Sequence, residues 1–209
     1  MEIKLEKLQK YHDSREILNI AYFTFKKGLI HQLSGTNGAG KSTLFDILSL
    51  LDADYAGQVR FDDQDIRTIP RDGSIVTQVF QKPVMLNRTV RENIMYPLKL
   101  KGIADELIAE QLDFYLSYLP LGFLLDQKAT KLSLGEAQKV SLIRGLMLKT
   151  PILLLDEPFS AMDRVSRENG LEMIFAHQNL HHSTILVISH REIEHEMMNQ
   201  VILEGGTLQ

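Results

Sequence analysis

The stretch Gly35-Thr-Asn-Gly-Ala-Gly-Lys-Ser42 decides the fold of this chain, because it matches the pattern G-x-x-x-x-G-K-[ST] at every fixed position. The apolar segment 29–33 before it predicts a short buried strand, and the apolar-rich segment 43–51 after it is long enough for a helix. In a strand–loop–helix of this kind, the N–H groups of the loop and the helix N-terminus attract phosphate. The stretch therefore predicts a nucleoside triphosphate site. The alternative, a chance match in a glycine-rich turn, is disfavoured by this context.

The side chains of this stretch have separate expected roles. Lys41 reaches the β- and γ-phosphates, and the hydroxyl of Ser42 is a ligand for Mg²⁺. The residues expected to contact the nucleotide are Gly35, Thr36, Asn37, Gly38, Ala39, Gly40, Lys41, Ser42 and Thr43.

Bulk composition narrows the class of protein. The chain has 209 residues, of which 44% are hydrophobic and 24% charged, as in an ordinary globular protein with one sizeable core. Its net charge of −4 comes from interspersed acids and bases, so we expect no nucleic-acid partner. The longest apolar run, 151–155, is far shorter than the ~20 residues of a membrane helix, and no signal peptide is visible. The absence of cysteine excludes disulfides and thiol–metal sites and fits a reducing, cytoplasmic location.

The first third of the chain predicts strands around the phosphate-binding stretch. Ile3 and Leu5 alternate with charged residues, and residues 16–25 are rich in β-branched and aromatic side chains. Residues 57–61 and 74–80 predict two further strands.

The sequence pattern then changes from strand-like to helical and later returns to strand-like. Apolar residues recur at helical spacing over residues 89–125 and 132–147, with Pro97, Gly102, Pro120 and Gly122 as interruptions. Strand-like runs return at 152–155, 184–188 and 201–203, and an amphipathic segment containing 168–175 separates the first two. We therefore expect an α/β fold in which a parallel sheet flanked by helices is interrupted by a helical insert at about residues 82–150.

A second motif is the run 151–158, in which an apolar, strand-like segment is followed by Asp156 and Glu157. A buried strand delivers both carboxylates to the carboxyl edge of the sheet, where ligands of such folds bind. Asp156 can hold Mg²⁺ through water, and Glu157 can act as general base on the attacking water. The alternative is an acidic strand end with solvated carboxylates.

Taken together, the motifs resemble those of ATP-binding-cassette (ABC) ATPases, in the family's order and over essentially the whole chain. Residues 132–136 (LSLGE) resemble the LSGGQ signature, and residues 79–81 (VFQ) resemble the Q-loop. Residues 159–163 (FSAMD) resemble the D-loop, His190 resembles the switch histidine, and Tyr11 falls where the family has an adenine-stacking aromatic residue.

The resemblance implies a P-loop NTPase fold and a set of further site residues. It implies a single ABC ATPase domain, 1–209, with a RecA-like core formed by 1–81 and 151–209. This core includes an antiparallel β subdomain, and residues 82–150 form the helical subdomain. It also makes ATP and Mg²⁺ the expected ligands.

Gln81 would ligate Mg²⁺ or orient water, and His190 would contact the γ-phosphate or orient Glu157. An ordinary loop glutamine and an ordinary strand-end histidine are the alternatives. Tyr11 would stack on adenine, or is a surface tyrosine without a ligand. The helix-like spacing of His177, His181 and His182 suggests a metal site, which the lack of nearby inward acids or cysteines disfavours.

In this family the signature works in trans, so a head-to-tail homodimer is implied. Ser133 and the N–H of Gly135 would meet the γ-phosphate held by Lys41 of the other copy. Leu134 departs from the family by replacing the first glycine of the signature pair. If that position needs a positive φ, we expect strain of roughly 1–2 kcal/mol and weaker dimer closure. Arg191 is a second departure, for which we have no physical account.

The single cassette with a short insert resembles ATPase subunits that dock on membrane permeases. Residues 82–102 are similar to the corresponding segment of bacterial importer ATPases, in which a groove beside the Q-loop receives a permease helix. Val84, Met85 and Leu86 either line that groove or belong to the core of the insert.

The resemblance also suggests a task and a location. The compact chain is most similar to oxyanion importers, for tungstate, molybdate or phosphate, which work with an extracytoplasmic solute-binding protein. A lipoprotein-release or efflux ATPase, or a non-transport ABC ATPase, is the alternative. The expected location is the cytoplasm, peripheral on the inner face of the cell membrane.

Overall fold

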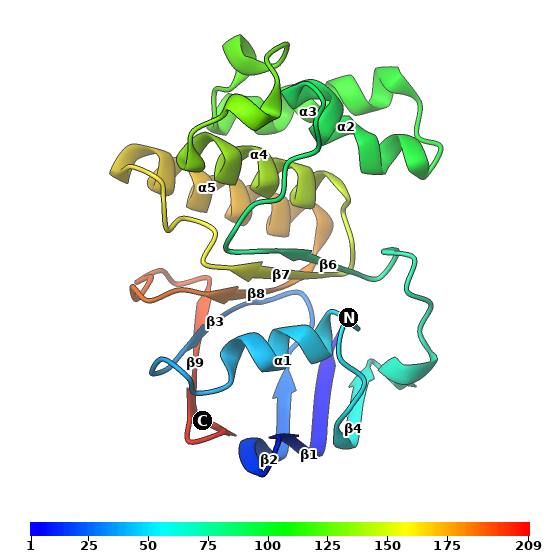
Figure 1. The fold of residues 1–209 in the computed structure, drawn as a ribbon, viewed down its shortest axis with the longest axis vertical. Helices are drawn as coiled ribbons and strands as arrows, with labels where there is room; N and C mark the ends of the chain where they lie inside the picture. The colour runs from blue at the N-terminus through cyan, green and yellow to red at the C-terminus, as the bar shows by residue number, and fades with distance from the viewer. The chain divides into compact units, whose positions relative to one another are not determined.

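The helices and strands follow the order that the hydrophobic pattern predicts. The computed structural model describes residues 1–209 (Figure 1). The strands are β1 (Ile3–His12), β2 (Arg15–Phe25), β3 (Ile30–Ser34), β4 (Ala56–Phe61), β5 (Gln64–Asp65), β6 (Val76–Val79), β7 (Ile152–Asp156), β8 (Thr184–Ile188), β9 (Met198–Glu204) and β10 (Thr207–Leu208). The α-helices are α1 (Lys41–Leu48), α2 (Val90–Leu100), α3 (Asp105–Tyr118), α4 (Leu134–Met147) and α5 (Arg164–His181). Short 3₁₀ turns lie at Ile66–Thr68, Gly122–Leu124 and Ala129–Lys131.

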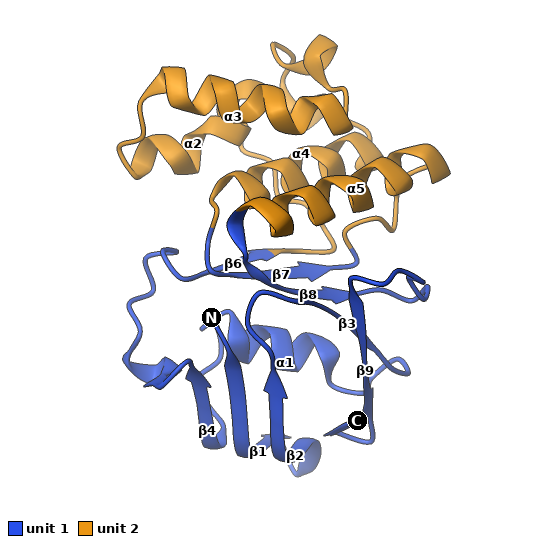
Figure 2. Cartoon of the chain, turned by 180° about the vertical axis from the view of Figure 1, so that it is seen from behind, with its two compact units in different colours: residues 1–78, 150–157, 181–209 blue, residues 79–149, 158–180 orange.

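The chain divides into two units, coloured separately in Figure 2. Unit 1 consists of Met1–Gln78, Thr150–Glu157 and His181–Gln209, and unit 2 of Val79–Lys149 and Pro158–Leu180. The division differs from the sequence-based one in that the segment with most of α5 belongs to the helical unit. The physical reason is its packing, since the buried His177 of α5 lies 2.8 Å from the hydroxyl of Tyr115 in α3.

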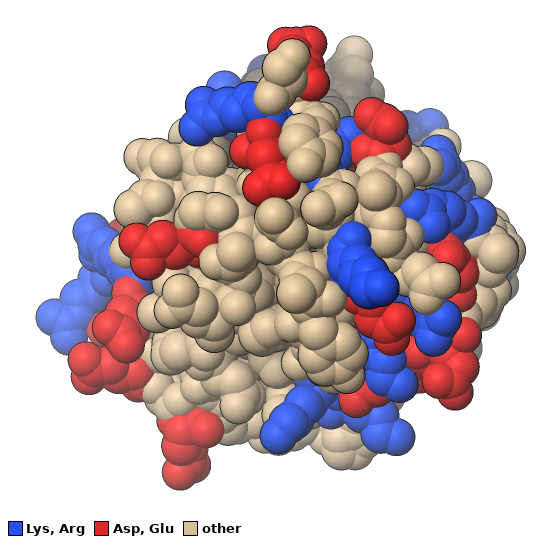
Figure 3. Space-filling view, turned by 90° about the horizontal axis from the view of Figure 1, so that it is seen from below, with Lys and Arg blue, Asp and Glu red and all other residues tan.

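Charged side chains are mixed in sign on the face that Figure 3 shows. Lysine and arginine lie among aspartate and glutamate around an uncharged middle, so this face has no large patch of one sign. No helix is long and apolar enough to cross a membrane.

The six-stranded sheet has the order β10-β9-β3-β8-β7-β6, with β3 inside it. β3 pairs in parallel with β8 and β9, and β7 pairs in parallel with β8. Parallel sheets of this kind are buried on both faces, which explains the continuous apolar runs of β7 and β8. The carboxyl ends of β3, β7 and β8 therefore meet at one edge, which is where the motif residues follow.

The antiparallel sheet has the order β2-β1-β4-β5 and supplies the subdomain expected in the N-terminal part. Ile3 of β1 pairs with Phe25 of β2 and with Phe61 of β4, and all three side chains are buried. Alternation along β1 turns Ile3 and Leu5 inward and leaves Lys4 partly exposed.

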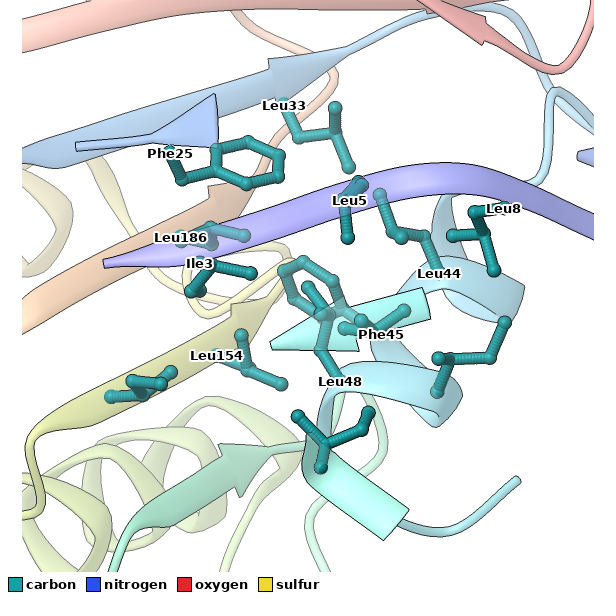
Figure 4. Close-up of a cluster of buried hydrophobic side chains, with 14 of the residues drawn as sticks. Ile3, Leu5, Leu8, Phe25, Leu33, Leu44, Phe45, Leu48, Leu154 and Leu186 are labelled. Carbon is teal, nitrogen blue, oxygen red and sulfur yellow. The ribbon is translucent and has the colours of Figure 1, made fainter. Parts of the chain in front are cut away.

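Helix α1 joins the two sheets of unit 1 into one core. Figure 4 shows Leu44, Phe45 and Leu48 of this helix pointing toward Ile3 and Leu5 of β1. The same cluster includes residues of the parallel sheet, namely Leu33, Leu154 and Leu186. Burying this apolar surface fixes α1, and with it the loop that begins the helix.

The predicted interruptions of the helical insert do not all end helices. Gly102 follows α2 with a φ of 72°, and Pro120 follows α3. Pro97, by contrast, lies inside α2. This helix begins with a capping box in which Thr89 and Glu92 satisfy each other's backbone N–H groups.

Candidate functional site

The phosphate loop connects β3, which ends at Ser34, to α1, which begins at Lys41. Two of its glycines are required by close approach as well as by backbone shape. Gly35 has a φ of 147°, and a Cβ there would lie 2.1 Å from the carbonyl oxygen of Leu203. Gly40 has a φ of 101°, and a Cβ there would lie 2.7 Å from Leu18. The loop is therefore held closely against β2 and β9.

Lys41 is buried and spans the loop. Its ammonium donates hydrogen bonds to the carbonyl oxygens of Gly35 at 2.8 Å and Thr36 at 3.0 Å. This places a positive charge over the loop, where phosphate would lie. Ser42, the next residue, is exposed at the start of α1.

Asp156 ends β7 and lies within electrostatic range of Lys41, His190 and Asp46. Partial burial raises the pKa of its carboxyl, the negative charge of Asp46 raises it further, and Lys41 and His190 lower it. Asp46 was not predicted from the sequence. Asp46 follows Ser42 by four residues, so the two lie on one face of α1, and this spacing could have indicated Asp46 from the sequence.

Glu157 follows in a backbone conformation that non-glycine residues seldom adopt, with a φ of 46°. Its N–H donates to the carbonyl oxygen of Ile188 at 3.0 Å, which fastens it to the end of β8. Oε1 of Glu157 lies 3.5 Å from Nε2 of His190. The structure thus brings together the two residues that the sequence assigned to water activation.

The surroundings of Glu157 raise the pKa of its carboxyl above the usual value for a glutamate. Burial raises the pKa of its carboxyl, and the nearby charge of Asp156 adds to this effect. The charge and the backbone N–H of His190 lower that pKa, as does Lys41. A base with a raised pKa is suited to accept a proton at neutral pH.

Unit 2 holds the Q-loop, signature and D-loop together through one buried amide that the sequence analysis missed. Nε2 of Gln138, in α4, donates to the carbonyl oxygen of Gln81 at 3.3 Å and to Oγ of Ser160 at 2.7 Å. Its Oε1 accepts the N–H of Ala161 at 2.8 Å. The side chain of Gln81 is exposed, whereas its backbone is fixed to α4, the helix that begins with the signature.

The signature begins α4, and its first turn shows that the expected strain at Leu134 is absent. Ser133 is the N-cap of α4 and forms a capping box with Glu136. Leu134 is the first helical residue and is not among the residues with a positive φ. The side chain of Leu134 is 60% exposed. Strain was expected only if this position needs a positive φ, and that condition is not met, because a helix start needs no left-handed residue here.

Gly135, the retained glycine of the signature, has a steric role. A Cβ at this position would lie 2.7 Å from the carbonyl oxygen of Ala161, so the D-loop backbone packs directly on it. Ser133 is exposed beside it, and its Oγ donates to Oε2 of Glu136 at 2.7 Å.

Tyr11 lies near the end of β1 and pairs with Glu16 of β2. It is 48% exposed, and its hydroxyl donates to Oε2 of Glu16 at 2.7 Å. The strand that holds Glu16 continues into Ile17 and Leu18, which contact the phosphate loop at Gly40. Tyr11 is thus an exposed ring connected to that loop through β2.

The segment after the Q-loop exposes part of its apolar side chains. Val84 is 68% and Leu86 37% exposed, whereas Met85 is half-buried. The backbone is held from inside unit 2, since the Arg144 guanidinium donates to the carbonyl oxygen of Val84 at 3.0 Å. Val84 and Leu86 therefore do not belong to the core of the insert.

The phosphate loop, its lysine and the acidic end of β7 define this chain as a P-loop ATPase. Residues 18–160 match the sequence profile described as ABC transporter. The chain therefore belongs to the ABC transporter family, as an ATP-binding subunit with ATPase activity, and such subunits work with membrane permease components.

Individual relatives agree with this assignment. The tungstate uptake system ATP-binding protein TupC of Peptoclostridium acidaminophilum is 38% identical over 208 residues, covering 99% of this chain and 96% of that protein. The spermidine/putrescine import ATP-binding protein PotA of Thermotoga maritima is 29% identical over 197 residues, covering 92% of this chain and 53% of PotA. The chain thus spans about half the length of that second relative.

The fold is also that of a solved structure of an ATP-binding subunit of an ABC transporter. The two superpose with a TM-score of 0.88 at 22% identity, covering 100% of this chain and 88% of the other. The α/β fold predicted from the sequence is confirmed.

Proposed function

We propose that Glu157 activates the water that attacks the γ-phosphate of ATP, with His190 orienting the pair. The observation that carries this proposal is the 3.5 Å approach of the two side chains at the edge that also holds Lys41 and Asp156. Lys41 would neutralise charge on the β- and γ-phosphates, as the transferred group requires. Tyr11 would stack on the adenine ring.

The residues at this edge suit Mg²⁺. The Ser42 hydroxyl and the Asp156 carboxylate, both in unit 1, are hard oxygen donors. Because its motif resembles the Q-loop, we also propose Gln81 as a third ligand through its amide oxygen. When bound, the ion would neutralise phosphate charge.

We infer that the working form is a homodimer in which each ATP contacts two copies. Ser133 and the Gly135 N–H, at the start of α4 in one copy, would meet the γ-phosphate held by Lys41 of the other. The first N–H groups of a helix lack intrahelical partners and suit an anion, which supports this role.

The proposed task is to drive an importer for an oxyanion, with tungstate as the first candidate. The support is the likeness to TupC over nearly the full length of both chains. The ATPase would lie on the inner face of the membrane, with Val84 and Leu86 facing a permease helix and an extracytoplasmic binding protein supplying the solute. A lipoprotein-release or efflux system is the competing task.

Copurification tests the task. The tagged full chain, expressed in its own host, is isolated in detergent, and the associated membrane and solute-binding proteins are identified by mass spectrometry. Elemental analysis of the binding protein is then expected to find tungsten or another oxyanion-forming element. A lipoprotein partner, or ATPase activity that depends on nucleic acid with no membrane partner, would contradict the proposal.

A further inference from the structure

A glutamine inside the parallel sheet has no role in the description so far. Gln32 is the central residue of β3 and lies three residues before Gly35, the first glycine of the phosphate loop. Its side chain is 1% exposed, so its amide must find partners within the protein. Strands that are buried on both faces of a parallel sheet are mostly apolar, so a buried amide in β3 is uncommon.

Two backbone groups of the segment that follows His190 bind this amide directly. Nε2 of Gln32 donates to the carbonyl oxygen of Arg191 at 2.8 Å, and Oε1 accepts the N–H of Ile193 at 2.9 Å. Both ends of the amide are therefore used on one short stretch of backbone, 159–161 residues further along the chain.

A second amide completes the clamp. Nε2 of Gln200, on the neighbouring strand β9, donates to Oε1 of Gln32 and to the carbonyl oxygen of Ile193, each at 3.2 Å. Ser189 binds the same segment from the other end, because its Oγ donates to the carbonyl oxygen of Arg191 at 3.0 Å and accepts its N–H at 3.2 Å. The backbone that follows His190 is thus fixed to the sheet by Gln32 and Gln200, and to Ser189 by the hydroxyl of that residue.

His190 needs such fixation because it is exposed and follows the end of β8. Its side chain lies 3.5 Å from Glu157, and its backbone N–H binds the Glu157 carboxylate. A shift of the Arg191–Ile193 backbone would move both groups away from the carboxylate. Misplacement by about 1 Å is enough to lower a rate by roughly a hundredfold.

We propose that Gln32 is a positioning residue for hydrolysis, which fixes His190 against Glu157 by clamping the backbone of residues 191–193 to the strand that leads into the phosphate loop. The inference rests on the proposed roles of Glu157 and His190.

The test compares steady-state ATPase kinetics of the full chain, four single variants and one double variant. Gln32→Met keeps the length of the side chain and removes its donor and its acceptor. We expect kcat to fall by roughly tenfold or more. KM for ATP should stay within about twofold, because the phosphate loop is intact. Deuterium exchange at the Ile193 amide should become faster.

Gln200→Met, at an exposed residue, removes only the outer part of the clamp and should lower kcat in the same direction by less. Asn199→Leu is the matched control, since its amide binds the carbonyl oxygen of Ile30 in the same sheet and does not touch the clamped segment. This control should leave kcat unchanged.

His190→Ala separates the two proposals. In the His190→Ala background, Gln32→Met should lower kcat only slightly further, because the imidazole that Gln32 positions has been removed. Equal losses in both backgrounds, an unchanged kcat in folded Gln32→Met, or a change in KM alone would overturn the inference. If Gln32→Met does not fold, an unchanged kcat in Gln200→Met overturns it. An unchanged kcat in His190→Ala would instead refute the proposed role of His190, and the inference with it.

Discussion

Glu157 combines an uncommon backbone conformation with a buried carboxylate. Its φ of 46° persists because the N–H is fastened to Ile188 and the side chain meets His190. Sparsely populated conformations of this kind cost of order 1–3 kcal/mol and cluster at functional sites. This conformation places the carboxylate beside the side chain of His190.

The pH dependence of hydrolysis follows from the surroundings of Glu157. Burial and Asp156 raise its pKa, so the acid limb of the kcat profile should lie above the usual range of a glutamate. His190→Ala removes a group that lowers this pKa, so the limb should move to higher pH while the maximal rate falls. Rate profiles from pH 5 to 9 measure both effects. A limb that moves to lower pH in the variant would contradict the assignment of Glu157 as base.

Tyr11 offers a test of nucleotide contact at a single ring. Tyr11→Ala should raise KM for ATP by roughly three- to tenfold, since an aromatic contact contributes about 0.5–1.5 kcal/mol. Tyr11→Phe keeps the ring and loses only the bond to Glu16, so it should resemble the parent chain. Equal KM values for the alanine and phenylalanine variants would show that the ring does not stack on the base.

In the first turn of α4, the neighbouring positions 134 and 135 are expected to differ in how much a substitution lowers stability. Leu134→Ala truncates an exposed side chain and should change stability by less than about 0.5 kcal/mol. Gly135→Ala places a methyl group 2.7 Å from the carbonyl oxygen of Ala161 and should cost roughly 1–3 kcal/mol. Denaturant unfolding of the two variants measures the difference. A Gly135→Ala variant as stable as the parent would mean that the D-loop moves away freely.

The same element shows what the sequence could and could not reveal. The phosphate loop was predictable because its determinants lie in eight consecutive residues, Gly35 to Ser42. The helical conformation of Leu134 was predictable too, since the S-x-x-E pattern of Ser133 and Glu136 indicates a capped helix start. Gln138 was not predictable, because its partner Gln81 lies 57 positions away and a lone glutamine carries no periodic signal.

At the scale of the whole molecule, the proposed dimer depends on ATP that is bound and not yet hydrolysed. Glu157→Gln removes the proposed base and keeps the side-chain volume, so ATP binding should persist while turnover is lost. Sedimentation velocity with ATP and Mg²⁺ is expected to show a dimer that falls apart when ATP is removed. Lys41→Ala, which should not hold phosphate, is the control and should remain monomeric. A monomeric Glu157→Gln chain that binds ATP would contradict the shared site.

The place of β3 in the sheet has a consequence for synthesis on the ribosome. Both strands that pair with it, β8 and β9, lie more than a hundred residues later, between Thr184 and Glu204. The carbonyl of Leu203 that packs on Gly35 also comes from this late stretch. The phosphate loop therefore emerges from the ribosome long before the strands that fix its final conformation. Nucleotide binding to this loop can stabilise the folded chain only after nearly all residues up to Glu204 have emerged.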